Sequence, residues 1–244
     1  MKNTDIEKRL EQNRIPFDKE LPEKLEIYLA LLQEWNSRMD LTAVTDNEET
    51  IDKHFVDSLI VMKTDLIGRE AKLIDVGTGA GFPGMVLAMA CPAMKVTLLD
   101  SQQKRLSFLQ AVAEKAEVKN VTLIHARAED GARKAELREK FDVAAARALA
   151  PMNILCEYLL PYVSVEGCAL CWKGPALKNE LESGRNAAHL LGGRMEMPVS
   201  YAVYGREWEH MILPVRKIRP QCSHSTACRP CKDRPVCLPP STGR

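Results

Sequence analysis

Apolar residues in the first 65 positions recur at helical spacing. A helix is predicted to begin near Leu21 and to continue to Trp35. A second helix is predicted over residues 47–62, with Ile51, Phe55, Leu59 and Met62 on one face. Residues 1–65 are therefore expected to form an N-terminal helical extension.

Beyond residue 65 the pattern changes to alternating strands and helices. Apolar runs predict seven strands, at 73–77, 96–100, 121–125, 141–146, 167–172, 194–203 and 207–215. Helical periodicity falls at 83–91, 102–116, 151–162 and 175–190. This alternation predicts a Rossmann-like α/β domain over residues 66–215, with a mostly parallel seven-stranded sheet and helices on both faces. Ligands of such sheets bind outside the carboxyl ends of the strands.

The composition is that of a soluble globular protein. The chain has 244 residues, of which 45% are hydrophobic and 27% are charged. No apolar run reaches the length of a membrane span, and the first eight residues are too charged for a signal peptide. We expect a monomeric, cytoplasmic protein that makes no membrane contact.

The net charge of +1 hides an uneven distribution. From residue 216 onward there are seven basic residues and one acidic residue, a charge of +6, which leaves −5 on the preceding part. Residues 216–244 are therefore expected to be a basic, cysteine-rich and poorly ordered tail. Its charge favours contact with nucleic acid, and a solvated tail with no partner is the alternative.

The cysteines do not predict a metal site. Cys168 and Cys171 have C-x-x-C spacing, but they should point to opposite faces of one strand. The tail also has a C-x-x-C, with His224 nearby, but it offers almost no apolar residues for a zinc site to pack around. We predict no metal, and the alternative is a small zinc site in the tail. Its ligands would come from Cys222, Cys228, Cys231 and Cys237.

A glycine-rich loop after the first strand carries the strongest chemical signal. Residues 73–84 read LIDVGTGAGFPG, and glycines let the backbone of such a loop lie directly against a ligand. Asp100 ends the next strand, where nucleoside-binding α/β folds hold ribose hydroxyls. These two features predict a cofactor that contains a nucleoside.

Two residues of this segment, Asp75 and Pro83, favour S-adenosylmethionine over NAD. The loop matches the G-x-G-x-x-G pattern of dinucleotide sites. However, the Asp75 carboxylate is unfavourable beside a pyrophosphate and favourable beside an amine and a sulfonium. Pro83 also removes one of the helix N-terminal N–H groups that would bind an anion. An NAD-linked oxidoreductase is the alternative.

The order of several short motifs resembles the small-subunit (16S) ribosomal RNA guanine-N7 methyltransferases, the glucose-inhibited division protein B family. The resemblance rests on the glycine loop and on motifs spread over roughly residues 20–219. These motifs are Trp35-Asn36-Ser37-Arg38-Met39-Asp40-Leu41-Thr42-Ala43, His54-Phe55-Val56-Asp57-Ser58-Leu59, Asp100-Ser101, Lys104-Arg105, Phe108-Leu109, Ala128-Glu129, Ala146-Arg147-Ala148 and Lys173-Gly174.

The resemblance implies a methyltransferase that uses S-adenosylmethionine to methylate guanine N7 in small-subunit ribosomal RNA. The implied partner is that RNA or the small ribosomal subunit, and a non-catalytic RNA-binding ribosome-assembly factor is the alternative. Combined with the loop argument, it predicts a set of cofactor-binding residues. These are Asp75, Gly77, Gly79, Phe82, Asp100, Ala128, Glu129 and Arg147.

No general base is expected, because guanine N7 has a lone pair and no proton to remove. Arg147 and Lys173, which follow predicted strands, are candidates for positioning the substrate. His54 and Asp57 share a helix face, so they could form a catalytic pair. We favour instead a structural role, in which Asp57 orients His54 or caps a neighbouring turn.

The chain departs from the family pattern at two places. Asp40 stands where the family usually has asparagine, and the tail lacks the family's usual Pro- and Lys-rich ending.

Overall fold

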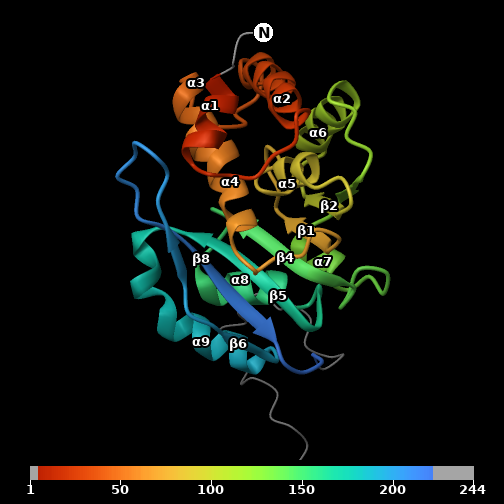
Figure 1. Ribbon diagram of the computed structural model, residues 1–244. Helices are drawn as coiled ribbons and strands as arrows, with labels where there is room; N and C mark the ends of the chain where they lie inside the picture. Colours follow the sequence, from red (N-terminus) through yellow and green to blue (C-terminus); the bar gives the residue numbers. More distant parts are fainter. Residues whose placement is uncertain (1–4, 222–244) are drawn as a thin grey trace, which may run out of the picture.

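The computed structural model describes residues 5–221, whose strands form one mixed sheet of eight strands (Figure 1). Its order is β3-β2-β1-β4-β5-β8-β6, and β7 also pairs with β8. The strands are β1 Lys72–Val76, β2 Lys95–Asp100, β3 Val121–His125, β4 Phe141–Arg147, β5 Val163–Lys173, β6 Gly193–Met195, β7 Val199–Tyr201 and β8 His210–Lys217. The first five are parallel, whereas β8 runs antiparallel to β5, β6 and β7.

The α/β fold class is confirmed, but the described sheet has one strand more than the seven predicted. The segment 194–203, expected as one strand, is divided into β6 and β7, which pair with different halves of β8. Pro198 lies between them and has no N–H to donate to a ladder. β8 also extends to Lys217, past the boundary predicted after residue 215, so the first two residues of the predicted tail belong to the sheet.

Two layers of helices cover the sheet, and the strand residues alternate between them. The helical elements are α1 Asp5–Gln12, α2 Leu21–Asn36, α3 Asn47–Thr50, η1 Ile51–Val56, α4 Asp57–Leu59, η2 Ile60–Lys63, α5 Gly84–Ala90, α6 Gln103–Lys115, α7 Ala128–Gly131, α8 Met152–Leu159, η3 Pro175–Asn179 and α9 Leu181–Leu190. One core joins α1, α2, η1, α4, α5 and α6 to one face, and a second joins α8 and α9 to the other. Cys168 belongs to the first core and Cys171 to the second, as their spacing predicts.

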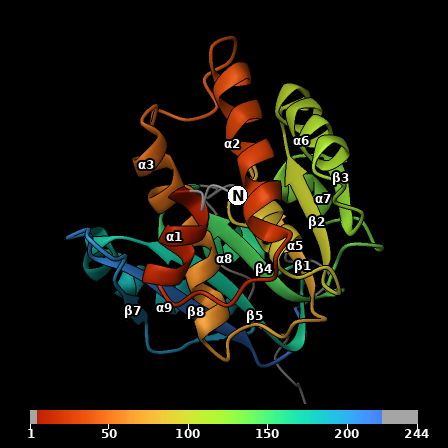
Figure 2. The same cartoon turned by 45° about the horizontal axis from the view of Figure 1, so that its top comes forward.

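The N-terminal helices lie on the face of the sheet that also carries α5 and α6 (Figure 2). The helix predicted over 47–62 is present as one helical segment that ends at Lys63, although its hydrogen-bonding pattern changes along its length. Residues 51–56 form a π-helix, a feature that is rare and often found at functional sites.

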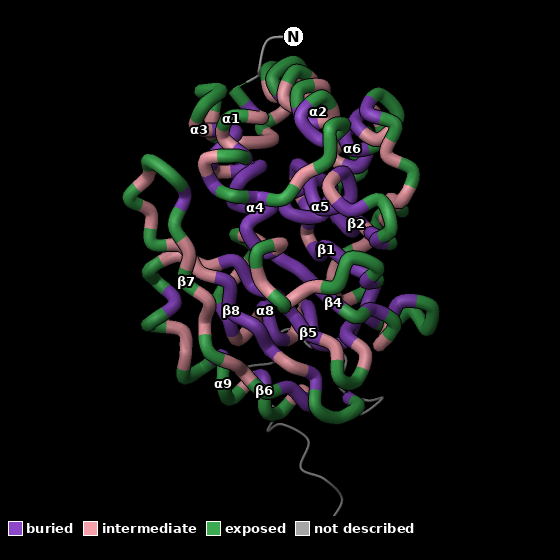
Figure 3. The backbone as a smooth tube through the Cα atoms, viewed as in Figure 1, coloured by how far each residue is buried: buried purple, intermediate pink, exposed green. Residues whose placement is uncertain are grey.

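Burial concentrates along the central strands and the helices packed on them (Figure 3). The carboxyl ends of β1, β2 and β4 are included, because Asp75, Asp100 and Ala146 are all buried. Within residues 5–221 no helix is long and apolar enough to cross a membrane, and no cluster of His, Cys, Asp and Glu could hold a metal ion. The four tail cysteines of the alternative zinc site lie outside the described residues.

Candidate functional site

The loop between β1 and α5 is folded around the carboxylate of Asp75. Its Oδ2 accepts hydrogen bonds from Thr78 Oγ1 at 2.7 Å and from the Gly84 N–H at 2.8 Å. Gly77 and Gly79 have φ angles of +68° and +60°, which residues other than glycine rarely adopt. A Cβ at Gly79 would meet only the Gly77 carbonyl, at 3.9 Å. The backbone at Gly79 is therefore open to a ligand.

Asp75 is fully buried, and its Oδ1 has no hydrogen-bond partner among the described residues. Burial raises the pKa of this carboxyl from 3.8 to about 6, although the hydrogen bonds from Thr78 and Gly84 oppose the shift. A buried acceptor without a partner is unfavourable until a donor reaches it. The loop thus fits a ligand that carries an amine or a hydroxyl group.

Asp100, at the end of β2, ties the glycine loop to the neighbouring strand. Its Oδ2 accepts from the Gly79 N–H and its Oδ1 from the Gln102 N–H, both at 2.8 Å. Arg105 adds an ion pair at 3.6 Å. Each carboxylate oxygen can accept a further hydrogen bond, so a ribose contact at Asp100 stays a prediction that the geometry allows.

Ala128 and Glu129 begin α7, next to the end of β2. The Ala126 N–H donates to the Asp100 carbonyl at 3.1 Å, and Tyr162 fixes the start of α7 by donating to the Ala128 carbonyl at 2.6 Å. Both predicted residues are half-buried. The fold therefore brings them to the same sheet edge as Asp100 and the glycine loop.

Arg147, the last residue of β4, reaches across to the N-terminal extension. Its Nη1 donates to the Lys53 carbonyl at 2.7 Å and to Asp57 Oδ2 at 3.0 Å, and its Nη2 donates to His54 Nδ1 at 3.0 Å. The guanidinium also lies 5.1 Å from the ring centroid of Phe82. Arg147 thus joins the glycine loop to η1 and α4.

His54 and Asp57 do not form a pair, because the Arg147 guanidinium lies between them. Of the two structural roles expected for Asp57, orienting His54 or capping a turn, the first is not made by direct contact, because both residues bind Arg147 instead. Burial and the charge of Arg147 lower the pKa of His54 to about 3. Because Arg147 can only donate, His54 Nδ1 accepts, and the protonated Nε2 donates to Thr42 Oγ1 at 2.8 Å. A neutral histidine held in this way has a structural role between Arg147 and Thr42.

Lys173 holds the loop that follows β4. Its ammonium donates to the Ala150 carbonyl at 2.9 Å and to Glu180 Oε2 at 2.6 Å. Leu149, from the same loop, lies on the side of Gly77 where a side chain would project, and a Cβ there would lie 2.7 Å from its Cδ1. Lys173 therefore shapes the site through the loop, and a direct role in positioning substrate stays a prediction.

Two residues of the site were not predicted from the sequence. Tyr201, at the end of β7, donates to Asp57 Oδ1 at 2.7 Å, and His210, at the start of β8, donates to the same oxygen at 2.7 Å. They are 144 and 153 residues from Asp57 in the chain. The antiparallel pairing of β8 with β5, and of β7 with β8, brings them to this end of the strands, and no local motif marks them.

Known proteins resemble this chain over most of its length. A family model described as GidB, rRNA small subunit methyltransferase G, matches residues 21–206. A ribosomal RNA small subunit methyltransferase G from Clostridium botulinum (strain Eklund 17B / Type B) is 46% identical over 205 residues, covering 84% of this chain and 86% of the relative. The protein of the same name from Clostridium beijerinckii is 45% identical over 213 residues, covering 87% and 89%.

The likeness to solved structures concerns the fold. The crystal structure of M. jannaschii TYW2 in complex with AdoMet matches with a TM-score of 0.54 and 14% identity, and the match covers 73% of this chain and 81% of that chain. At this identity the match supports the arrangement of strands and helices and carries no residue roles.

Proposed function

The chain belongs to the rRNA small subunit methyltransferase G family, and we propose that it transfers a methyl group from S-adenosylmethionine to N7 of a guanine in small-subunit ribosomal RNA. The observation that carries the proposal is the glycine loop at the carboxyl end of β1. Its backbone is open at Gly79, and beneath it the buried Asp75 has an oxygen without a partner.

The residues around the loop fit S-adenosylmethionine. In the proposed arrangement Gly77, Gly79 and Phe82 contact the cofactor with Asp75 below them, and Asp100 faces its ribose. Ala128 and Glu129 meet the adenine, where the Glu129 carboxylate can accept from the exocyclic amine. Arg147 lies at the edge shared by cofactor and substrate. The bound cofactor supplies an electrophilic methyl group.

The chain's own residues position the substrate and remove no proton. Guanine N7 attacks through an in-plane lone pair, so the protein must hold the base in line and close. His54 cannot serve as a base toward the substrate, because Arg147 and Thr42 occupy both ring nitrogens. The target guanine must already be unstacked or be turned out of a helix to reach the site.

Nucleoside analysis of ribosomal RNA tests the proposal directly. We expect 7-methylguanosine to fall by one residue per small subunit in a strain lacking the gene, and to return with the wild-type gene. An assembly factor without activity would leave the modification unchanged, and an NAD-linked oxidoreductase would bind NAD and not S-adenosylmethionine in calorimetry.

Asp75→Asn should weaken S-adenosylmethionine binding while keeping the loop folded. The amide oxygen can still accept from Thr78 and Gly84, but the charge is lost. Hydrogen bonds to charged groups contribute about 1.5–3 kcal/mol, so Kd should rise roughly 10- to 100-fold at pH 8. Because the pKa of Asp75 is raised to about 6, ionisation destabilises the free protein above that pH, and the variant should melt at a higher temperature.

The same pKa sets a pH dependence for binding. A cationic ligand prefers the ionised carboxylate, so wild-type affinity should be full above about pH 6 and should fall up to tenfold per unit below it. Asp75→Asn should lose this dependence. Asp142→Asn is the matched control, since Asp142 accepts from the Lys72 N–H at the amino ends of β1 and β4, the opposite end of the strands. Equal affinity of wild type and Asp75→Asn would refute the assignment.

Methyl transfer itself should be almost independent of pH. In single-turnover reactions with saturating cofactor, the rate should stay flat between about pH 6.5 and 9, because N7 carries no proton and no general base is needed. His54, with a pKa of about 3, remains neutral throughout this range. A slope of one proton that disappears in His54→Ala would contradict this mechanism.

A further inference from the structure

The Asp57 carboxylate is a buried junction between the N-terminal extension and the sheet. Oδ2 accepts from Arg147, and Oδ1 accepts from both Tyr201 and His210. The Trp172 indole fixes the backbone by donating to the Asp57 carbonyl at 3.1 Å. Burial alone would raise the pKa of Asp57, but the hydrogen bond from His210 and the charge of Arg147 hold it below its usual value. The carboxylate is therefore ionised and fixed from three directions.

These contacts orient Arg147 without exhausting its hydrogen-bonding capacity. A guanidinium has five N–H donors. Nη1 makes two hydrogen bonds and Nη2 makes one, so Nε–H and one Nη2–H remain without a partner among the described residues. The side chain is 14% exposed. Arg147 is thus held rigidly while keeping two donors for a ligand at the cofactor edge.

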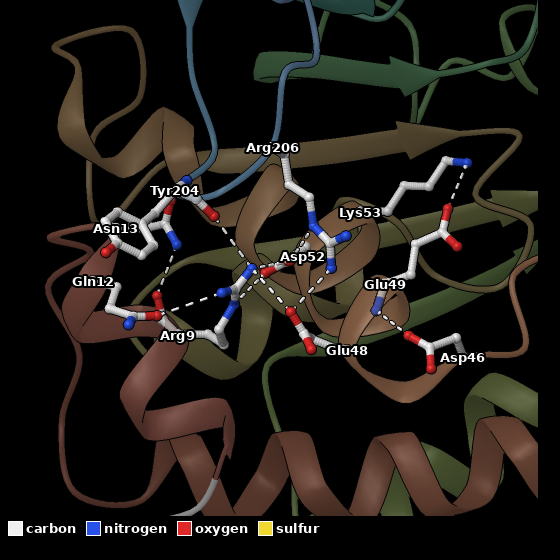
Figure 4. Close-up of polar contacts among 10 residues, drawn as sticks. All are labelled: Arg9, Gln12, Asn13, Asp46, Glu48, Glu49, Asp52, Lys53, Tyr204 and Arg206. Carbon is white, nitrogen blue, oxygen red and sulfur yellow. Dashed lines mark hydrogen bonds and ion pairs between the residues drawn. The ribbon is translucent and has the colours of Figure 1, made fainter.

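The loop 202–209, which joins β7 to β8, is fastened to the same extension at a second place (Figure 4). The fully buried Asp52 of η1 accepts from Arg9 Nε and from Arg206 Nε, both at 2.7 Å. Arg9 also donates to the Tyr204 carbonyl at 3.2 Å, and Asn13 accepts from the Tyr204 N–H at 2.7 Å. We call this group the outer clasp.

Both attachments involve one short helical segment. Asp52 and Asp57 lie five residues apart, on η1 and at the start of α4, and the Lys53 carbonyl and His54 between them contact Arg147. The outer clasp holds the loop, and the ends of β7 and β8 that flank the loop hold Asp57. The position of Arg147 therefore depends on residues far from the cofactor loop.

We propose that Tyr201 and His210 are positioning residues for methyl transfer, which act through Asp57 to hold the Arg147 guanidinium at the cofactor edge. This inference rests on the proposed function for its kinetic readout. Neither residue touches the glycine loop in the described contacts, so their effect must pass through Arg147. The outer clasp supports them by keeping the 202–209 loop against η1.

A double-mutant cycle tests this path. Tyr201→Phe removes the hydroxyl that donates to the Asp57 carboxylate. If the loss of this hydrogen bond displaces Arg147, kcat/KM for RNA should fall roughly tenfold or more. In an Arg147→Lys background the same change should cost less than twofold, because the fixed guanidinium is already lost. His210→Asn, which retains a donor near the position of Nδ1, should be milder than His210→Ala. Tyr204→Phe is the matched control, as its hydroxyl makes no hydrogen bond among the described residues.

The outcomes separate positioning from stability. A merely structural Tyr201 would lower Tm and reduce kcat/KM by the same factor in both backgrounds, and that result would overturn the proposal. Unchanged kinetics in Tyr201→Phe would overturn it as well. Calorimetric affinity for S-adenosylmethionine, measured through the same cycle, gives a readout that does not need methylation. If the wild type proves inactive on RNA, the proposed function fails, while the binding cycle still decides the coupling between Tyr201 and Arg147.

Discussion

Gly79→Val should abolish S-adenosylmethionine binding, with a loss of affinity of 100-fold or more. Gly79 has a φ of +60°, and a Cβ there would project into open space at the loop surface. A valine must either strain the backbone, at about 1–3 kcal/mol, or shift the loop. In both cases its methyl groups occupy the space in which the cofactor would contact the backbone. Calorimetry with the purified variant measures the loss.

Two further variants distinguish steric exclusion of the cofactor from backbone strain at Gly79. Gly79→Asn places a side chain at the same position, but asparagine tolerates the left-handed region, so Tm should stay near wild type while binding is still lost. Gly68→Val repeats the Gly-to-Val change where an added Cβ would meet nothing within 4 Å, and it should bind the cofactor normally. Wild-type affinity in Gly79→Asn would mean that no ligand approaches this backbone.

The strand and helix pattern was predictable because burial imposes a short period on the sequence. Successive residues along β1 to β5 point alternately into the two cores, so each of these strands reads as an apolar run. Each is also followed by a helical segment, which separates it from the next run. The segment 194–203 was harder, because its apolar residues continue across Pro198 while its pairing does not. The end of β8 was missed because Lys217, which is buried, looks like part of a basic tail.

The grouping of the candidate residues at the strand ends was predictable for a related reason. In a parallel sheet the carboxyl ends of the strands meet, so Asp75, Asp100 and Arg147 could be placed together from strand positions alone. The partners of Arg147 could not be predicted. His54 and Asp57 looked like a pair because they lie three residues apart, whereas the Arg147 guanidinium separates them. Helical spacing shows which residues share a helix face, but it cannot show that a cation from a distant strand lies between them.

Buried charge explains why this edge depends on so many long-range contacts. Asp52 and Asp57 are both buried, and each would be strongly destabilising without its cationic partners. Arg9 and Arg206 balance Asp52, while Arg147 balances Asp57. The partners come from the N-terminal helix, the β7–β8 loop and β4. The segment between the two aspartates is therefore fixed only when all three elements are in place.

Arg147→Lys should reduce kcat/KM by roughly 100-fold, although the charge is kept. The guanidinium reaches the Lys53 carbonyl, Asp57 and His54 at once, and a lysine ammonium cannot reproduce this planar arrangement. The loss of one charged hydrogen bond contributes about 1.5–3 kcal/mol, and the two free donors are lost as well. Steady-state kinetics on ribosomal RNA give the ratio, and calorimetry gives the share that comes from cofactor binding.

Arg216→Lys is the control. Arg216 also makes several contacts, with Glu196 and the Glu166 carbonyl, but it lies away from the carboxyl ends of the parallel strands. It should change stability modestly and leave kcat/KM near wild type. The Arg147 variant should also lose about 1–3 kcal/mol of unfolding free energy, since the buried acceptor His54 Nδ1 is left without its donor. Full activity in Arg147→Lys would show that a charge at this position suffices. The guanidinium geometry, and with it the positioning role of Tyr201 and His210, would then be refuted.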